Sequence, residues 1–131
     1  MRAFDEPSEV LSRPDQVFRA VAEHAIDAVF VLDQEGRTTF ANRAAEEMFG
    51  WSQAELAGRK LHDQIHYKHA DGSPFPMSEC PLGAVFQTGQ SLRLHDDIFY
   101  HRDGRPVPVT CSNGAIHQGG EVIGGLLIVR D

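Results

Sequence analysis

The stretch GRTTFANRAAEEMFGW, residues 36–51, decides the fold of this chain. It predicts a β-strand over residues 37–41 that runs directly into a short amphipathic helix over residues 43–49. Asn42 stands at the junction, where its side chain can cap the helix by accepting a hydrogen bond from an amide of the first turn. Gly50 follows the last apolar residue of the helix and is suited to end it.

The flanking residues extend this pattern on both sides. The nearly continuous apolar run over residues 28–33 predicts a strand buried on both faces, and residues 34–36 predict a turn. After the helix comes SQAELAGR, residues 52–59, in which Ser52 and Glu55 are spaced as a capping box for a second helix. This order of strand, turn, strand, Asn, helix, Gly and S-x-x-E-L-x-G-R resembles the front half of a PAS sensory domain.

The rest of the chain supplies the remaining elements of that fold. The resemblance covers residues 15–131 and implies an α+β fold, with one five-stranded antiparallel sheet, short helices on one face and an N-terminal helix. A GAF-type sensor fold is the alternative, and the pattern from Asn42 to Gly58 favours PAS. The elements expected outside the first motif are helices over 14–25 and 78–88, strands over 92–100, 106–117 and 122–129, and an Asp103-Gly104 hairpin turn between the first two of these strands.

The length of 131 residues corresponds to one domain. We expect a flexible lead-in over residues 1–13 and a single PAS-like sensory domain over residues 14–131. We expect this domain to be cut from a longer signalling protein of bacterial type with a C-terminal output domain, such as a histidine kinase, a cyclase or a transcription regulator. A stand-alone sensor that works by pairing is the alternative.

Charge and hydropathy narrow the class of partner. The formal net charge is −7 and the basic residues are scattered, so direct binding to nucleic acid is not expected. No apolar run reaches the length of about 18 residues that spans a bilayer, so we expect no membrane contact by this segment. The cysteine count of 2 gives no disulfide framework, which predicts a reducing, cytoplasmic compartment.

The N-terminal helix has one apolar face, formed by Phe18, Val21, Ala22 and Ala25. In PAS-like domains such a helix often packs against a second copy, so we expect a homodimer through it. The alternative is that the helix covers its own sheet.

The resemblance also implies an apolar pocket, which can hold a small ligand. The strand and helix faces assign it these residues: Phe30, Phe40, Met48, Leu61, Ile65, Phe86, Leu94, Cys111 and Ile128. The same residues would form an ordinary core in a ligand-free interaction and dimerisation domain. Asn42 is expected to be a structural cap, and its replacement by Ala to cost about 1 kcal/mol of stability.

A second set of residues has metal-ligand chemistry: His62, His66, His69 and Cys80. Because His66 and His69 are three residues apart, one helix face could present both to a metal or to haem. The structural alternative is that the histidines hydrogen-bond a loop and that Cys80 is inert, although a thiolate near a helix start could act as a redox switch.

Flavin photochemistry is not expected. Light-sensing relatives carry a reactive cysteine after the Gly-Arg pair, and GRKLHD at residues 58–63 has none. We therefore expect no cofactor as purified, with haem or non-covalent flavin as alternatives.

Catalysis is not expected from this domain. His101-Arg102-Asp103 matches the start of a kinase catalytic loop, but Pro108 stands where that loop needs an Mg²⁺-binding Asn. No Gly-x-Ser-x-Gly elbow or paired carboxylates occur at a useful spacing. A C-terminal output domain would carry any enzymatic activity.

Overall fold

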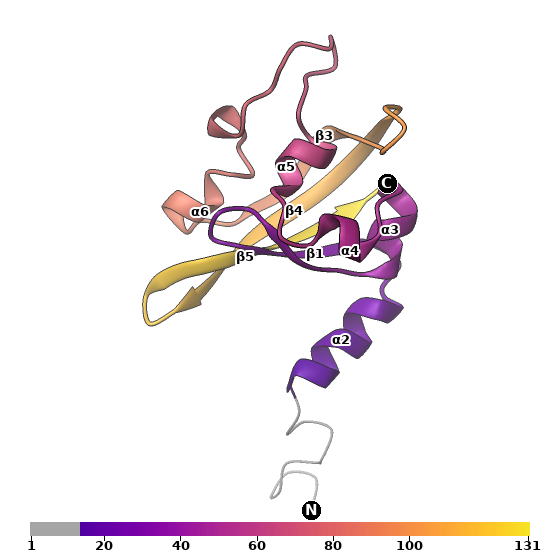
Figure 1. Ribbon diagram of the computed structural model, residues 1–131. Helices are drawn as coiled ribbons and strands as arrows, with labels where there is room; N and C mark the ends of the chain where they lie inside the picture. Colours follow the sequence, from indigo (N-terminus) through magenta and orange to yellow (C-terminus); the bar gives the residue numbers. More distant parts are fainter. Residues whose placement is uncertain (1–13) are drawn as a thin grey trace, which may run out of the picture.

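The structure is a computed structural model that describes residues 14–131 (Figure 1). The lead-in predicted over residues 1–13 lies outside this range. None of the helices within it is long and apolar enough to cross a membrane. The elements in chain order are α2 (Pro14–His24), β1 (Ala28–Asp33), β2 (Thr38–Ala41), α3 (Arg43–Phe49), α4 (Gln53–Leu56), α5 (Leu61–Ile65), the 3₁₀ helix η1 (Met77–Glu79), α6 (Val85–Thr88), β3 (Leu92–Tyr100), β4 (Pro106–Gln118) and β5 (Glu121–Arg130).

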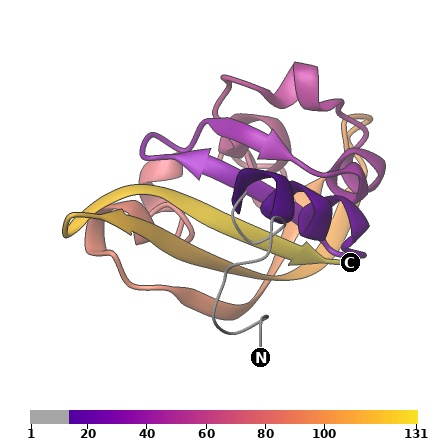
Figure 2. The same cartoon turned by 90° about the horizontal axis from the view of Figure 1, so that it is seen from below.

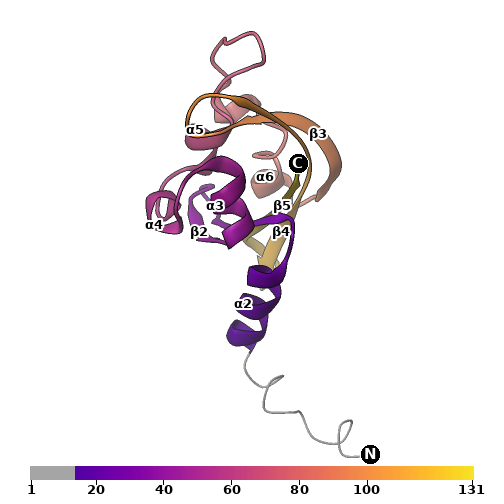
Figure 3. The same ribbon diagram turned by 90° about the vertical axis from the view of Figure 1, so that its right-hand side faces the viewer.

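The five strands form one antiparallel sheet in the order β2-β1-β5-β4-β3. The last strand in the chain, β5, is therefore the central strand and pairs with both β1 and β4. β3 is strongly curved and bends around α5 and α6 (Figure 3). The predicted α+β class, with its five-stranded antiparallel sheet, is confirmed.

The inner face of the sheet, which faces α3 to α6, carries the main core. Phe49 of α3 is fully buried between Phe30 of β1 and Phe99 of β3, with ring centroids 6.0 Å from each. Aromatic rings at this spacing pack favourably beyond the area that they bury. The short helices are thus held to the sheet by one continuous apolar cluster.

Among residues 14–131, the helix that covers the outer face of the sheet is α2. Ala22, Val29 and Phe40 form a small separate cluster there, and Phe18 meets Phe40 edge to face at 5.5 Å between ring centroids. Figure 1 shows α2 on the side of the sheet opposite α5 and α6, and Figure 2 shows it beside the C-terminal end of β5. Arg130 at that end forms an ion pair with Asp27, which follows α2.

Asn42 connects these two faces. Its side-chain oxygen accepts hydrogen bonds from the amide of Ala45, as a cap of α3, and from the amide of Val29 in β1. Its side-chain nitrogen donates to the carbonyls of Ala22 and Asp27. Asn42 is fully buried, so four hydrogen bonds that water cannot replace depend on one side chain.

The helix predicted over residues 78–88 is wrong in its first half. The chain forms the 3₁₀ helix η1, a turn, and then the single α-helical turn of α6, which ends at Gly89 in the left-handed conformation. Pro81 explains the break, because a residue that precedes proline avoids the helical region. Cys80 accordingly has an extended backbone, with a ψ angle of 122°.

The sequence places Leu92, Leu94, Ile98 and Tyr100 at alternate positions of β3, but the structure does not keep them on one face. The pairing with β4 shifts register between Leu92 and His95, and Leu94 has a φ angle of 51° and an exposed fraction of 85%. An irregularity of this kind inserts one residue and exchanges the two faces of the strand beyond it. The core therefore receives Phe99, whereas the sequence pattern assigned Leu94, Ile98 and Tyr100 to one face.

Candidate functional site

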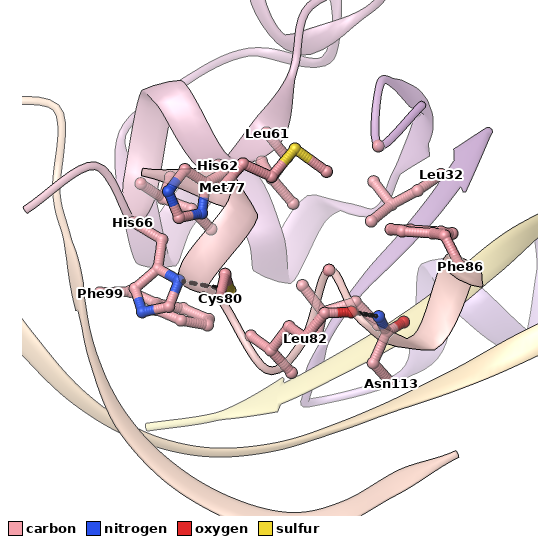
Figure 4. A pocket seen from close by; sticks show the side chains of 14 residues that line it. Leu32, Leu61, His62, His66, Met77, Cys80, Leu82, Phe86, Phe99 and Asn113 are labelled. Carbon is pink, nitrogen blue, oxygen red and sulfur yellow. Dashed lines mark hydrogen bonds between the residues drawn. The ribbon is translucent and has the colours of Figure 1, made fainter. Parts of the chain in front are cut away.

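A small cavity of about 40 Å³ lies between the inner face of the sheet and the helices α5, η1 and α6 (Figure 4). Strands β1, β3, β4 and β5 supply one wall, and the helices with their connecting turns supply the other. The surface of the cavity is mostly apolar. Its lining residues are Leu32, Gly36, Leu61, His62, Ile65, His66, Met77, Cys80, Leu82, Gly83, Phe86, Phe99, Asn113 and Leu127.

Three metal-ligand side chains meet at one end of the cavity. His62 and His66 are four residues apart, so they lie on the same face of α5 and the residue that ends it. Cys80, in the turn after η1, approaches them, and one donor atom from each of the three lies within 4.8 Å of the others. The Cys80 sulfur lies 3.4 Å from Nδ1 of His66 (Figure 4).

The second nitrogen of each imidazole is held by an acceptor. Nε2 of His62 donates to the carbonyl of Phe75 at 2.6 Å, and Nε2 of His66 donates to a carboxylate oxygen of Asp97 in β3 at 3.0 Å. The other oxygen of Asp97 lies 2.7 Å from Nε2 of His95. Cys80, His66 and Asp97 therefore form a linear chain of thiol, imidazole and carboxylate.

The hydrogen-bonded series of Cys80, His66 and Asp97 changes the pKa of each of these three side chains. Burial opposes ionisation of the Cys80 thiol, but the imidazoles of His62 and His66 outweigh it and lower the pKa of Cys80 to about 6. Burial also disfavours the His66 imidazolium, yet Asp97 and Cys80 outweigh it and raise the pKa of His66 to about 9. For Asp97, burial is outweighed by His66, which lowers the pKa to about 2. The arrangement favours a thiolate, an imidazolium and a carboxylate near neutral pH.

The second cysteine provides the contrast. Cys111 is also buried, but its sulfur only donates to the backbone carbonyl of His95. Burial, with the nearby charges of Asp97 and Cys80, raises the pKa of Cys111 to about 12. Two buried cysteines in one core thus differ in acidity because only Cys80 has imidazole neighbours.

The opposite part of the cavity contains one buried amide. The side-chain nitrogen of Asn113 donates to the carbonyl of Leu82 at 2.9 Å (Figure 4). Its side-chain oxygen is buried and accepts no hydrogen bond from any group in the described residues. A Cβ atom on Gly125 would lie 3.0 Å from that oxygen and 2.9 Å from the Phe86 ring. Glycine at this position lets Asn113 and Phe86 approach β5.

The pocket residues predicted from sequence divide by the face on which they lie. Leu61, Ile65 and Phe86 line the cavity. Phe30, Met48 and Cys111 belong to the surrounding inner core and are not lining residues. Phe40 and Ile128 lie on the outer face against α2, and Leu94 points to solvent, so these three residues are corrected as pocket members.

The predicted metal-ligand set also changes. His62, His66 and Cys80 come together, whereas His69 lies outside the cluster and stacks on Phe75 with ring centroids 4.2 Å apart. The helix α5 ends at Ile65, so His66 and His69 do not share a helix face as predicted. Sequence reasoning missed Asp97 and Asn113. The spacing of β3 could have indicated Asp97 only if the register shift after Leu92 had been known.

Comparison with known proteins identifies the fold. The PAS fold profile matches residues 16–131. The chain belongs to the PAS family. PAS domains are signal-sensing modules and are typically non-catalytic. A PAS domain from Colwellia psychrerythraea superimposes with a TM-score of 0.71 at 20% identity, covering 90% of this chain and 96% of that one.

Two further matches carry the names of a sensor histidine kinase and a diguanylate cyclase. A domain of a sensory box sensor histidine kinase/response regulator from Geobacter sulfurreducens has a TM-score of 0.70 at 24% identity, covering 95% of this chain and 99% of that one. A probable diguanylate cyclase, DgcE, of Escherichia coli (strain K12) is 30% identical over 106 residues, which is 80% of this chain. The chain spans only 9% of the length of that curated relative.

The cavity size bears on the large cofactors that some PAS domains carry. Pockets that hold drug-sized ligands or cofactors have volumes of roughly 300–1,000 Å³. The cavity of about 40 Å³ is far smaller, and Phe86, Leu82 and Met77 are among the side chains that enclose it. The residues as arranged do not fit haem or flavin.

Proposed function

We propose that this PAS domain is a cytoplasmic sensor whose inner cavity binds a small ligand. The change in packing that binding causes is transmitted through the sheet to a C-terminal effector. The observation that carries this proposal is the shared wall of the cavity. Leu127 of the central strand β5 lines it, and β5 ends at Arg130 beside Asp27. A change of packing in the cavity would therefore reach the end of the domain along one strand.

The lining chemistry indicates the class of ligand. The surface of the cavity is mostly apolar, and the unpaired oxygen of Asn113 would accept one hydrogen bond. A small apolar molecule with a single donor group satisfies both features, since a buried acceptor without a partner costs free energy.

Pairing through α2 is the second part of the proposal. Val21 of α2 has an exposed fraction of 66%, and Ile26, which follows the helix, has an exposed fraction of 92%. Both are large apolar side chains, one in α2 and one just after it, and a second copy packed on α2 would cover them. Because α2 lies beside the end of β5, a dimer of this kind would place two C-terminal effectors close together.

A ligand-free interaction domain is the alternative function. The small volume of the cavity favours it, because a cavity of about 40 Å³ holds only a few atoms without movement of α5 or α6. The effector in either case would be a kinase, a cyclase or a transcription regulator, and the domain itself would be non-catalytic.

Native mass spectrometry of the purified 131-residue chain, with an absorption spectrum of the same sample, tests the proposal. We expect a dimer mass and an added mass that is released on denaturation. Ile65→Phe, which fills the cavity, should remove the added mass, whereas Ile128→Phe on the outer face should retain it. A dimer without added mass would favour the ligand-free alternative, and a bare monomer would contradict both.

A further inference from the structure

We propose that His62, His66 and Cys80 form a three-ligand site for a thiophilic transition-metal ion, with Zn²⁺ as the expected occupant and a fourth position that opens into the cavity. This inference does not depend on an organic ligand or on an effector. It rests on the distances within the cluster, the orientation of the rings and the chemistry of the donors.

The spacing of the donors suits a small metal ion. With bonds of about 2.3 Å to sulfur and about 2.0 Å to nitrogen, tetrahedral geometry places neighbouring ligand atoms about 3.5 Å apart. The Cys80 sulfur and Nδ1 of His66 are 3.4 Å apart. The widest spacing in the cluster is at most 4.8 Å, so the third ligand atom must move only a short distance closer to reach the ion.

The ring orientations are fixed in the way that metal ligands require. Metal-binding histidines donate their second ring N–H to a carboxylate or a backbone carbonyl, which sets the tautomer and directs the free lone pair at the ion. His66 donates through Nε2 to Asp97, and His62 donates through Nε2 to the carbonyl of Phe75. Because both acceptors hold a proton on Nε2, Nδ1 of each ring is the nitrogen that would bind a metal, and the ion would displace the Nδ1 proton of the His66 imidazolium.

The donor set selects the class of metal. A site of two imidazoles and one thiolate suits Zn²⁺ and similar thiophilic ions, and it does not suit Mg²⁺ or Ca²⁺, which prefer oxygen ligands. The cavity beside the cluster is large enough for a water molecule at the fourth position. His69 could have completed the set, but its ring is stacked on Phe75 outside the cluster.

Occupancy would also connect two separate parts of the domain. His62 lies in α5 and His66 directly follows it, Cys80 belongs to the turn after η1, and His66 is already tied to β3 through Asp97. An ion at this position would hold the two helical walls of the cavity to each other and to the sheet.

Titration of the full metal-free chain with Co²⁺, followed by displacement with Zn²⁺, tests the proposal. We expect one Co²⁺ per chain, a tetrahedral visible spectrum and a sulfur-to-cobalt charge-transfer band, all removed by Zn²⁺. Cys80→Ser should abolish the charge-transfer band, and His62→Gln or His66→Gln should weaken binding by more than the roughly 10–100-fold that loss of an outer-shell partner costs. Cys111→Ser and His69→Gln are the matched controls and should bind as the parent chain does.

Asp97 supplies a further test as a positioning residue. Asp97→Asn should keep the charge-transfer band but weaken Zn²⁺ binding about tenfold, because a neutral amide supports the His66 ring less well. Asp96 is the control, because its carboxylate accepts a hydrogen bond from the Thr110 hydroxyl and not from His66. Asp96→Asn should leave Zn²⁺ binding unchanged. The proposal is overturned if the folded parent chain, verified by circular dichroism, binds no Co²⁺, or if Cys80→Ser leaves the charge-transfer band intact.

Discussion

The two faces of this PAS sheet are built very differently, although they share the same strands. The inner face has a continuous core, a cavity and a buried chain of Cys80, His66 and Asp97. The outer face has a cluster of three buried apolar residues, one on α2 and two on the sheet, and exposes large apolar side chains beside it. The central strand β5 contributes to both, since Leu127 faces inward and Leu126 packs outward. The comparison teaches that the continuous core and the ionisable cluster lie on one face, whereas the exposed apolar side chains through which we propose pairing lie on the other.

The largest expected effect is a loss of unfolding free energy when a buried aromatic residue is truncated, and it should differ between the two faces. Phe49→Ala should cost about 3–5 kcal/mol of unfolding free energy, because it removes the ring between Phe30 and Phe99 and leaves a cavity in a closed core. Phe40→Ala should cost less, at or below about 3 kcal/mol, because α2 can settle on the smaller side chain. Urea denaturation measures both. Equal losses would contradict the difference between the faces.

The next effect tests the residue that joins the two faces. Asn42→Ala should cost about 2–4 kcal/mol in urea denaturation, because it leaves the amides of Val29 and Ala45 buried without an acceptor. This exceeds the value of about 1 kcal/mol expected for a cap alone. Ser52→Ala, which removes only the cap of α4, is the control. Equal losses for the two variants would show that Asn42 acts as a cap and nothing more.

The smallest effect on stability tests the outer face. Ile26→Glu should change the unfolding free energy by less than about 0.5 kcal/mol, because the side chain is exposed in the single chain. If α2 pairs, the same substitution should convert a dimer to a monomer in sedimentation equilibrium. Ile123→Glu, at another exposed isoleucine, should leave the dimer intact. Retention of the dimer in Ile26→Glu would place the interface elsewhere.

Local sequence signals predicted most of the fold. The capping box of Ser52 and Glu55 and the Asp103-Gly104 turn act over a few residues, and the structure confirms both. The predicted helix over residues 78–88 failed because Pro81 outweighed the apolar spacing that followed it. Local sequence signals were thus sufficient to predict which helices and strands form, but not where each of them begins and ends.

The site was less predictable because it depends on pairing between distant strands. The register shift after Leu92 turns Leu94 outward and Asp97 inward, and no local pattern marks it. Asp97 is separated from His66 by 31 residues, so their contact follows from the curvature of β3 rather than from sequence spacing. The residue types in the sequence indicated a cluster that contains His62, His66 and Cys80, but they did not indicate that His69 lies outside it.

The claim that the inner face holds a charged thiolate–imidazolium–carboxylate chain has one direct test. The ultraviolet absorption of the Cys80 thiolate should be followed against pH in metal-free Cys111→Ser protein. The imidazoles of His62 and His66 face Cys80 from α5, and Asp97 supports His66 from β3.

Because these groups outweigh burial and lower the pKa of Cys80, the thiolate should form with a midpoint at about pH 6 and disappear below it. Asp97→Asn in the same background should move the midpoint upward, because the His66 imidazolium loses its carboxylate partner. A midpoint at or above the ordinary thiol value of 9.0 in the parent background would contradict the account.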